Sequence, residues 1–114
     1  MDRRRRLKKG KEIQAVFDSG ASLRGSRFFL RSVPNDVGVN RWAFAVGKKL
    51  APGSVKRNRV RRKLREAVCS AGVEDKDGRD IVLIAGRGSM EASVGELARE
   101  LERMLEQLKG QVRR

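Results

Sequence analysis

The 114-residue sequence contains no histidine and no tyrosine, and its only cysteine is Cys69. Histidine is the commonest acid–base catalyst and metal ligand, so its absence argues against an independent nuclease or metalloenzyme. One cysteine allows no intramolecular disulfide, which fits a reducing compartment. No apolar run reaches the ~18 residues of a membrane span, and no apolar signal segment follows the basic start. We therefore expect a cytoplasmic protein without a membrane partner.

Acidic residues are scarce in the first part of the chain. Residues 1–65 carry 20 Lys and Arg against 4 Asp and Glu, a net charge of +16, whereas residues 66–114 carry 8 against 10, a net charge of −2. The whole chain has a net charge of +14. Such an excess makes a polyanion the expected partner, because binding releases the counterions of a phosphate backbone. We expect one small domain whose binding surface is built mainly from its first two-thirds.

The first half of the chain shows both helical and strand periodicity. Ile13, Val16 and Phe17 fall on one helical face, and Gly20 is a natural stop. Further on, apolar residues alternate with period two. Trp42 belongs to this pattern as an expected core residue, with a stacking platform as the alternative. These signals predict a flexible basic arm over residues 1–9, a helix over 10–18, and strands over 21–24, 27–33 and 41–47.

The second half predicts two longer helices around a buried strand. Ser54 is a plausible N-cap of the first helix, which we expect to bury Cys69 as a small apolar residue. Ser93 and Glu96 match the capping-box pattern S-x-x-E at the start of the second, and Gly110 is expected to end it. The expected elements are a helix over 55–71, a strand over 81–85 and a helix over 94–109. The order is αβββαβα, a single α+β domain in which helices pack on one sheet.

The most informative segment is the basic stretch from Lys56 to Arg65 within the predicted helix 55–71. Like charges three or four residues apart destabilise an isolated helix by roughly 0.2–0.5 kcal/mol per pair, and this stretch has no acidic residue before Glu66. An anionic partner would relieve that repulsion, and the planar guanidinium of arginine suits phosphate. The alternative is an ordinary solvated face, although such faces usually mix both signs.

The spacing Arg57-Asn58-Arg59-x-Arg61-Arg62-x-x-Arg65 resembles the RNR signature of the bacterial ribonuclease P protein, a subunit of the ribonucleoprotein that removes the 5′ leader from precursor tRNA. The resemblance extends over essentially the whole chain in the right order. It includes the first predicted helix, the residues Val46-Gly47-Lys48-Lys49 and the strand from Asp80 to Ala85. It identifies residues 1–114 as one RNA-binding domain.

The resemblance implies a left-handed crossover through the basic helix and two RNA-binding surfaces. The RNR helix would face the catalytic RNA, and a cleft between the first helix and the sheet would hold the leader. The RNA subunit would perform the chemistry with Mg²⁺, so we expect no catalytic residue, metal or cofactor on the protein itself. The residues implied to bind the catalytic RNA are Arg57, Asn58, Arg59, Arg61, Arg62 and Arg65. Those implied to bind the leader are Ile13, Phe17, Ser22, Phe29, Arg31, Lys48 and Lys49.

Two of these positions depart from the family pattern. Family members often carry aromatic residues where this chain has Ile13 and Arg31. Because base stacking on an aromatic ring contributes roughly 1–3 kcal/mol per base, this cleft is expected to stack less and to rely more on charge or on arginine stacking. For Ile13 and Phe17, plain core packing remains an alternative to leader contact.

Two further segments could suggest ligand sites. Gly86-Arg87-Gly88-Ser89 lacks the full pattern of a phosphate loop, and we interpret it as a turn between a strand and a helix. Glu74, Asp75, Asp77 and Asp80 could form a metal site, but a solvated loop with Asp80 preceding a strand is the better interpretation.

Three other functions compete with the ribonuclease P subunit. A structural RNA-binding protein of the ribosome is compatible with the composition. A DNA-binding regulator would use helix 55–71 as a recognition helix, but such a helix normally follows another helix across a short turn, whereas strands precede this one. We therefore expect no DNA partner. An autonomous nuclease is disfavoured by the missing histidine.

Overall fold

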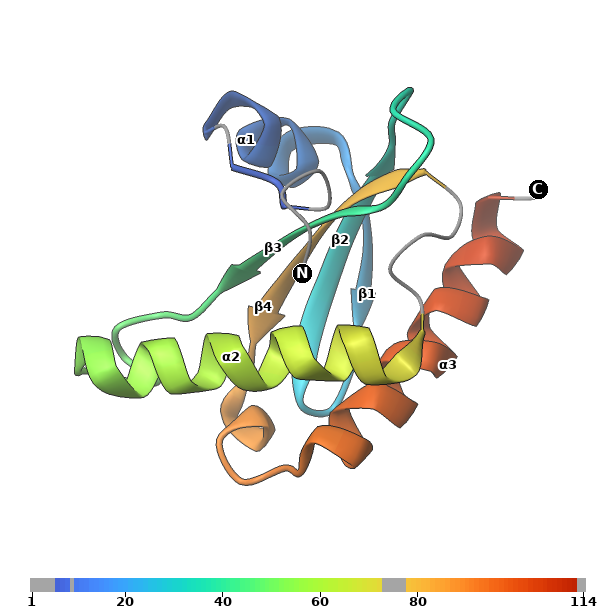
Figure 1. Cartoon of the computed structure of the whole chain (residues 1–114). Helices are drawn as coiled ribbons and strands as arrows, with labels where there is room; N and C mark the ends of the chain where they lie inside the picture. The colour runs from blue at the N-terminus through green and yellow to red at the C-terminus, as the bar shows by residue number, and fades with distance from the viewer. Residues whose placement is uncertain (1–5, 9, 73–77, 113–114) are drawn as a thin grey trace.

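The computed structural model describes residues 6–8, 10–72 and 78–112. The elements follow the predicted order αβββαβα, and a short 3-10 helix precedes the last helix (Figure 1). They are α1 (Gly10–Ser19), β1 (Ala21–Arg24), β2 (Phe28–Pro34), β3 (Arg41–Ala45), α2 (Ser54–Ala71), β4 (Arg79–Ala85), η2 (Arg87–Ser89) and α3 (Val94–Val112). The α+β fold class is therefore confirmed. Most of the predicted basic arm, residues 1–5 and 9, lies outside the described residues.

The four strands form one sheet in the order β1-β2-β4-β3. β2 pairs antiparallel with β1 and β4, whereas β3 pairs parallel with β4. A parallel pair needs a crossover, which α2 supplies. In Figure 1, α2 lies in front of the sheet, and the chain passes from β3 through α2 to β4 in the left-handed sense. This confirms the unusual crossover, because such connections are right-handed in about 98% of cases.

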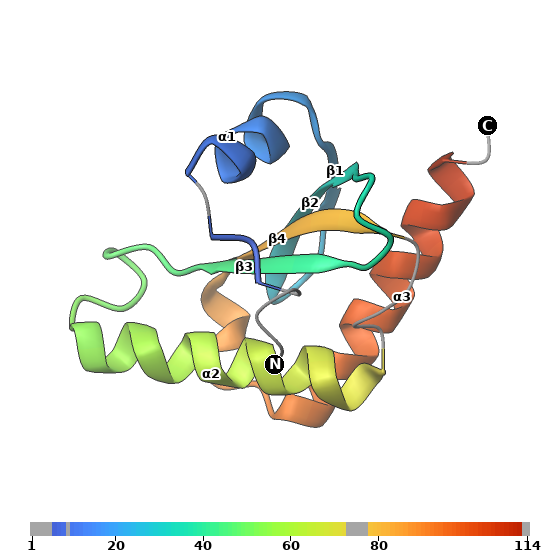
Figure 2. The ribbon, with the colours of Figure 1, turned by 45° about the horizontal axis from the view of Figure 1, so that its top comes forward.

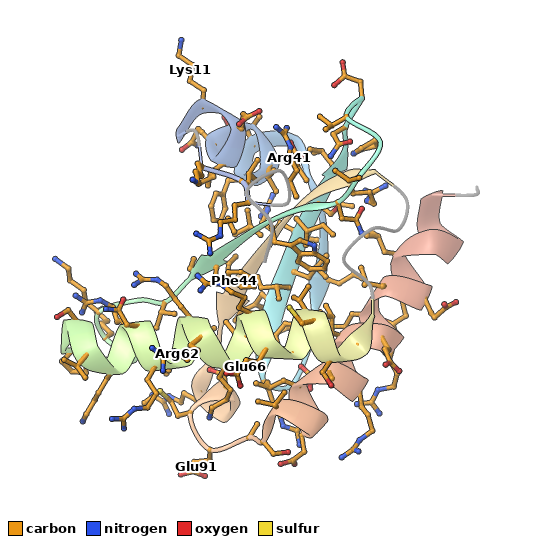
Figure 3. The ribbon with its side chains drawn as sticks, viewed as in Figure 1. Lys11, Arg41, Phe44, Arg62, Glu66 and Glu91 are labelled. Carbon is orange, nitrogen blue, oxygen red and sulfur yellow. The ribbon has the colours of Figure 1, made fainter. Side chains whose placement is uncertain are left out.

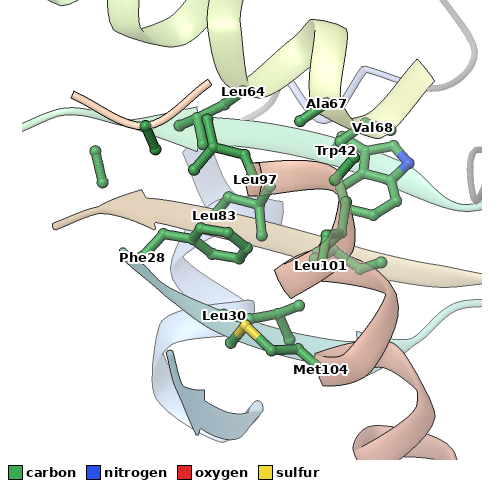
Figure 4. Packing of buried hydrophobic residues seen from close by; sticks show 14 of the residues in the cluster. Phe28, Leu30, Trp42, Leu64, Ala67, Val68, Leu83, Leu97, Leu101 and Met104 are labelled. Carbon is green, nitrogen blue, oxygen red and sulfur yellow. The ribbon is translucent and has the colours of Figure 1, made fainter. Parts of the chain in front are cut away.

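The larger core lies between the sheet and the helices α2 and α3 (Figure 4). β2, β3 and β4 contribute Phe28, Leu30, Trp42 and Leu83 to it, and α3 contributes Leu101. Trp42 is 1% exposed, so its predicted core position is confirmed. β4 is buried on both faces, as its continuous apolar run predicted, because helices cover the sheet on both sides.

A smaller core lies on the opposite face of the sheet, under α1 (Figure 2). Its buried residues are Leu7, Val16 and Val82. Ile13 and Phe17 pack against these three and stay partly exposed. Because α1 covers one face while α2 and α3 cover the other, the molecule has two separate surfaces on which RNA could bind.

Helix ends agree with the predictions at some positions and not at others. Gly72 ends α2 with a left-handed φ of +67°, a conformation that favours glycine. Gly53, with extended backbone angles, occupies the N-cap of α2, so the N-cap prediction for Ser54 is wrong by one residue. Gly110 lies inside α3, which runs on to Val112, so that predicted stop is also wrong. Glycine costs a helix only about 1 kcal/mol, so it need not end one.

The capping box of α3 forms as predicted. The backbone N–H of Ser93 donates to Glu96 Oε1 at 3.0 Å, and the backbone N–H of Glu96 donates to Ser93 Oγ at 3.1 Å. The hydrogen bond from the Ser93 backbone, and then the one involving its side chain, holds the pKa of the Glu96 carboxyl below its usual value. The ionised carboxylate therefore stabilises the start of α3.

The interpretation of Cys69 is wrong, because its side chain is exposed. Val60 and Leu64 mark the buried side of α2, and Cys69 follows Val60 by nine residues. Nine residues make about two and a half turns of helix, which turns Cys69 to the outer side.

The expectation that Asp80 precedes the last strand is also wrong. Asp80 is the second residue of β4 and is 6% exposed. Arg41 donates to its two carboxylate oxygens from Nε and Nη2, both at 2.8 Å, and Arg41 Nη2 also contacts Glu12 Oε2 at 2.9 Å. The hydrogen bond to Asp80 raises the pKa of the Arg41 guanidinium. The pair joins β3 to β4, and Glu12 connects it to α1.

Candidate RNA interface

The basic residues of α2 point in different directions, because they lie on different sides of the helix. Val60, Leu64, Ala67 and Val68 are buried against the core. Asn58, Arg59 and Arg62 are exposed, and Figure 3 shows Arg62 on the side of α2 away from the sheet. These exposed side chains are free to meet a large anionic surface. That this face of the RNR segment meets the catalytic RNA stays a prediction.

Two basic side chains of α2 bind the protein itself. Arg57 Nη1 donates to the carbonyl oxygens of Ala51 and Pro52, both at 3.0 Å, which holds the loop before the helix. Lys63 Nζ donates to three carbonyls of the loop after β4, those of Ser89, Met90 and Ala92, at 3.1, 2.9 and 3.0 Å. Lys63 is therefore a structural residue, and Arg57 has a structural role in addition to its predicted one.

Arg61 and Arg65 occupy the side of α2 that faces β3, one helical turn apart. The Arg65 guanidinium lies 6.0 Å from the centre of the Phe44 ring, within cation–π range. Arg61 Nη1 donates to Asn58 Oδ1 at 2.8 Å. Both arginines are partly buried, so their positions are more restricted than those of Arg59 and Arg62.

The start of α2 accumulates positive charge. Its first turn has no acidic residue, and the Gly53 N-cap makes no side-chain hydrogen bond to the helix. The unpaired N–H groups at a helix N-terminus carry partial positive charge, so the cationic side chains nearby repel it. A polyanion would relieve both the repulsion between side chains and the repulsion from the helix end.

The other candidate surface is the face of the sheet beneath α1. Arg31 on β2 donates from Nη2 to the backbone carbonyl of Phe17 at 2.6 Å, and its guanidinium lies 5.9 Å from the centre of the Phe17 ring. Ser22 on β1 is the direct pairing partner of Arg31. The structure therefore brings Phe17, Ser22 and Arg31 together, and Ile13 lies one turn before Phe17 on α1.

The surface continues along the same two strands to Phe29. Arg24 pairs with Phe29 across β1 and β2, and its guanidinium lies 5.5 Å from the centre of the ring. We did not single out Arg24 from the sequence. Its position two residues after Ser22 on a strand puts both on one face, so alternation alone could have identified it.

Beyond Phe29 the surface opens into a hollow of about 710 Å³. Phe29 and Lys49 are both part of its lining, together with Arg24 and Arg87. Arg27 also lines the hollow, but it is paired with Glu100 at 3.1 Å. Lys49 therefore lies close to Phe29, another of the residues implied to bind the leader. Lys48 is exposed and is not among the residues that line the hollow.

The other segments considered from the sequence as ligand sites are only partly described by the structure. The segment Gly86–Ser89 contains η2 and lies between β4 and α3, where a turn was predicted. Within residues 6–8, 10–72 and 78–112, no group of three or more His, Cys, Asp or Glu could hold a metal ion. Glu74, Asp75 and Asp77 lie outside the described residues. None of the described helices is long and apolar enough to span a membrane.

A family model described as ribonuclease P matches residues 1–109. The ribonuclease P protein component of Dehalococcoides mccartyi is 35% identical over 100 residues, which cover 88% of this chain and 81% of that protein. The corresponding protein of a Thermoanaerobacter species is 32% identical over 100 residues, covering 88% and 85%.

Solved structures agree with these relatives. The RNase P protein of Staphylococcus aureus superposes with a TM-score of 0.75 and 25% identity, covering 92% of this chain and 95% of the other. The RNase P protein of Thermotoga maritima has the same fold, with a TM-score of 0.78 and 22% identity over 90% and 96%. None of these matches supports the ribosomal alternative. The chain therefore belongs to the family of bacterial ribonuclease P proteins, the protein components of an endoribonuclease that processes tRNA.

Proposed function

We propose that this chain uses two different surfaces for two different RNAs. Membership of the family implies ribonuclease P RNA as a partner. In our proposal, the exposed face of α2 binds that catalytic RNA, through Arg59, Arg62 and the neighbouring RNR residues. The face of the sheet beneath α1, with Phe17 and Phe29, binds the 5′ leader of precursor tRNA.

The observation that carries the proposal is the separation of these surfaces by the sheet. The RNR residues lie on α2, and Phe17 lies on α1, which covers the opposite face of the sheet (Figure 2). Phe28 and Leu30 of β2 belong to the larger core, so alternation along the strand puts Phe29 and Arg31 on that opposite face. Both surfaces carry cationic side chains, but they differ in their exposure and in their aromatic content. The α2 surface is polar and exposed, which suits a phosphate backbone, while the α1 surface has aromatic rings, which suit unpaired bases.

The protein's contribution in this proposal is binding rather than chemistry. Its cations would lower the repulsion between the catalytic RNA and the precursor, and the α1 surface would extend contact along the leader. We expect the RNA subunit to require Mg²⁺ and to perform the cleavage, with no metal or cofactor bound by the protein itself. We also expect the holoenzyme to act in the cytoplasm.

The test compares Arg62→Ala with Phe17→Ala. Arg62→Ala should weaken binding to a bacterial ribonuclease P RNA even without substrate. Phe17→Ala should leave that binding unchanged and should weaken the holoenzyme's binding of precursor tRNA relative to mature tRNA, by about 1–3 kcal/mol if one base is no longer stacked. Both variants must melt as folded proteins, since Phe17 also packs against the smaller core. Equal weakening of precursor and mature tRNA by Phe17→Ala would exclude the leader assignment.

A further inference from the structure

A second groove lies at the β3 edge of the sheet, between β3, α2 and the described N-terminal residues 6–8, and Ile13 of α1 also lines it. It has a volume of about 310 Å³. Its lining includes four cationic side chains, Arg6, Lys8, Arg61 and Arg65, and the ring of Phe44. No carboxylate lines it. Figure 3 shows Phe44 between β3 and α2, which marks the position of this groove. We call it the edge groove.

The N-terminal wall of the edge groove is attached to the sheet. Arg6 forms a parallel bridge with Trp42 on β3, and the Leu7 N–H donates to the Trp42 carbonyl at 2.8 Å. The Leu7 side chain is 5% exposed and belongs to the smaller core. In extended backbone, neighbouring side chains point to opposite sides. Burial of Leu7 therefore turns Arg6 and Lys8 outward together, and both are exposed.

The helical wall is formed by Arg61 and Arg65. Arg65 lies against Phe44, and its Nε is buried without a hydrogen-bond partner among the residues that the structure describes. Within those same residues, none of the four cations of the groove forms an ion pair with a carboxylate. Four like charges around one hollow repel one another, and a bound anion is the simplest source of compensation.

We propose that the edge groove holds the sugar–phosphate backbone of the catalytic RNA, with Arg6 and Lys8 on one wall and Arg61 and Arg65 on the other. This inference rests on the proposed binding of that RNA by α2. It adds a second, non-helical wall to the interface and assigns it to two residues outside the RNR segment. The cations on opposite walls contact one strand in the groove.

The chemistry of the groove favours phosphate over bases. Two aromatic residues line it, and neither offers an open ring to a base. Trp42 is buried, and Phe44 is partly buried and lies against the Arg65 guanidinium. The remaining polar groups at its walls are guanidinium and ammonium donors, which match phosphate oxygens. Contacts to phosphate position an RNA without reading its sequence. The groove therefore contributes affinity and salt dependence.

The test measures binding of the full chain to a bacterial ribonuclease P RNA, without substrate, over a series of salt concentrations. Each phosphate neutralised contributes roughly 0.7–0.9 to the slope of log K against log salt. Arg6→Gln/Lys8→Gln should therefore lower that slope by roughly 1.5 and weaken binding on the order of tenfold. The control is Arg99→Gln/Arg103→Gln, which removes the same charge from exposed positions on α3 and should leave the slope unchanged.

A cycle with Arg61→Gln tests whether the two walls hold the same strand. If they do, removing one wall loosens the strand, and the loss in the combined variant is smaller than the product of the separate losses. Losses that multiply would overturn the single-strand groove. Normal binding by Arg6→Gln/Lys8→Gln, while Arg61→Gln and Arg62→Ala bind weakly, would overturn the edge groove and leave the proposed function intact. Normal binding by all these variants would reject the proposed function itself.

Discussion

Arg31 and Phe17 form a double contact: the Arg31 guanidinium donates a 2.6 Å hydrogen bond to the Phe17 carbonyl and lies 5.9 Å from the centre of the Phe17 ring. Phe17 belongs to the last turn of α1, where carbonyl groups have no partner within the helix. A cation at that position is favourable, so Arg31 both closes the end of α1 and fixes the ring. Its Nε is buried without a hydrogen-bond partner among the described residues.

This contact predicts that Arg31→Met weakens leader binding. The variant keeps an aliphatic chain of similar length but loses the positive charge and the N–H donors of the planar guanidinium. The preference of the holoenzyme for precursor over mature tRNA should fall by about 1–2 kcal/mol, the size of a partly desolvated cation–π contact. Equilibrium binding of both tRNAs measures it, with Arg103→Met on α3 as the control. A preference equal to that of the unmodified protein would contradict this role.

Lys63 is predicted to matter for stability rather than for RNA binding. Lys63→Met removes three hydrogen bonds to the carbonyls of Ser89, Met90 and Ala92. The free energy of unfolding should fall by about 1–3 kcal/mol, because those carbonyls lose a charged donor. Lys56→Met, at an exposed position of the same helix, should change it little. Urea unfolding gives the free energies. RNA affinity of the folded Lys63→Met protein should match that of the unmodified chain.

The capping box predicts a defined pH dependence. Ser93→Ala should cost about 1 kcal/mol of stability at neutral pH, as the loss of an N-cap does. The hydrogen bonds with Ser93 lower the folded-state pKa of Glu96, so its ionised form contributes stability above its unfolded pKa. That contribution disappears as pH falls through the folded pKa, which lies below the usual value of 4.5.

The difference between Ser93→Ala and the unmodified protein should therefore shrink as pH falls from about 6 to about 3. Urea unfolding at several pH values measures it, and Glu96→Gln should show a flatter profile than the unmodified chain over the same range. A difference that grows toward acid pH would show that the capping box is not the cause.

Self-repulsion predicts stabilisation by polyvalent anions. A net charge of +14 on 114 residues is concentrated in the first 65, which include the start of α2. An anion that binds only the folded protein adds about 2.7 kcal/mol at a hundredfold excess over its Kd. Pyrophosphate at low millimolar concentration should raise the Tm in a saturable manner. A Tm that follows ionic strength alone, whatever the anion, would contradict specific binding.

Periodicity in the sequence predicted the order of helices and strands, because burial of one face leaves a regular pattern in each. It also contained information that we did not use. The outward direction of Cys69 was readable from the helical repeat, because nine residues after Val60 the helix presents its opposite side. The N-cap position at Gly53 was harder to predict, since helix boundaries shift by a residue or two without changing the pattern.

Contacts between distant residues were not predictable from local pattern. Arg41 and Asp80 are 39 residues apart and meet because β3 pairs with β4. Similarly, the basic residues of α2 look alike in sequence, yet Lys63 binds a loop of the protein while Arg62 faces outward. The two surfaces for RNA were expected from family resemblance rather than from charge, and their separation by the sheet required the three-dimensional arrangement.

The most direct test of the account is reconstitution with a bacterial ribonuclease P RNA. Precursor tRNA cleavage is measured at low Mg²⁺ concentration with the RNA alone, with the purified protein alone, and with both together. The account predicts that the protein alone cleaves nothing and that its addition to the RNA raises the rate, more for a precursor with a leader long enough to reach the α1 surface than for one with a very short leader. Specific leader removal by the protein alone, or no increase on adding it to the RNA, would contradict the account.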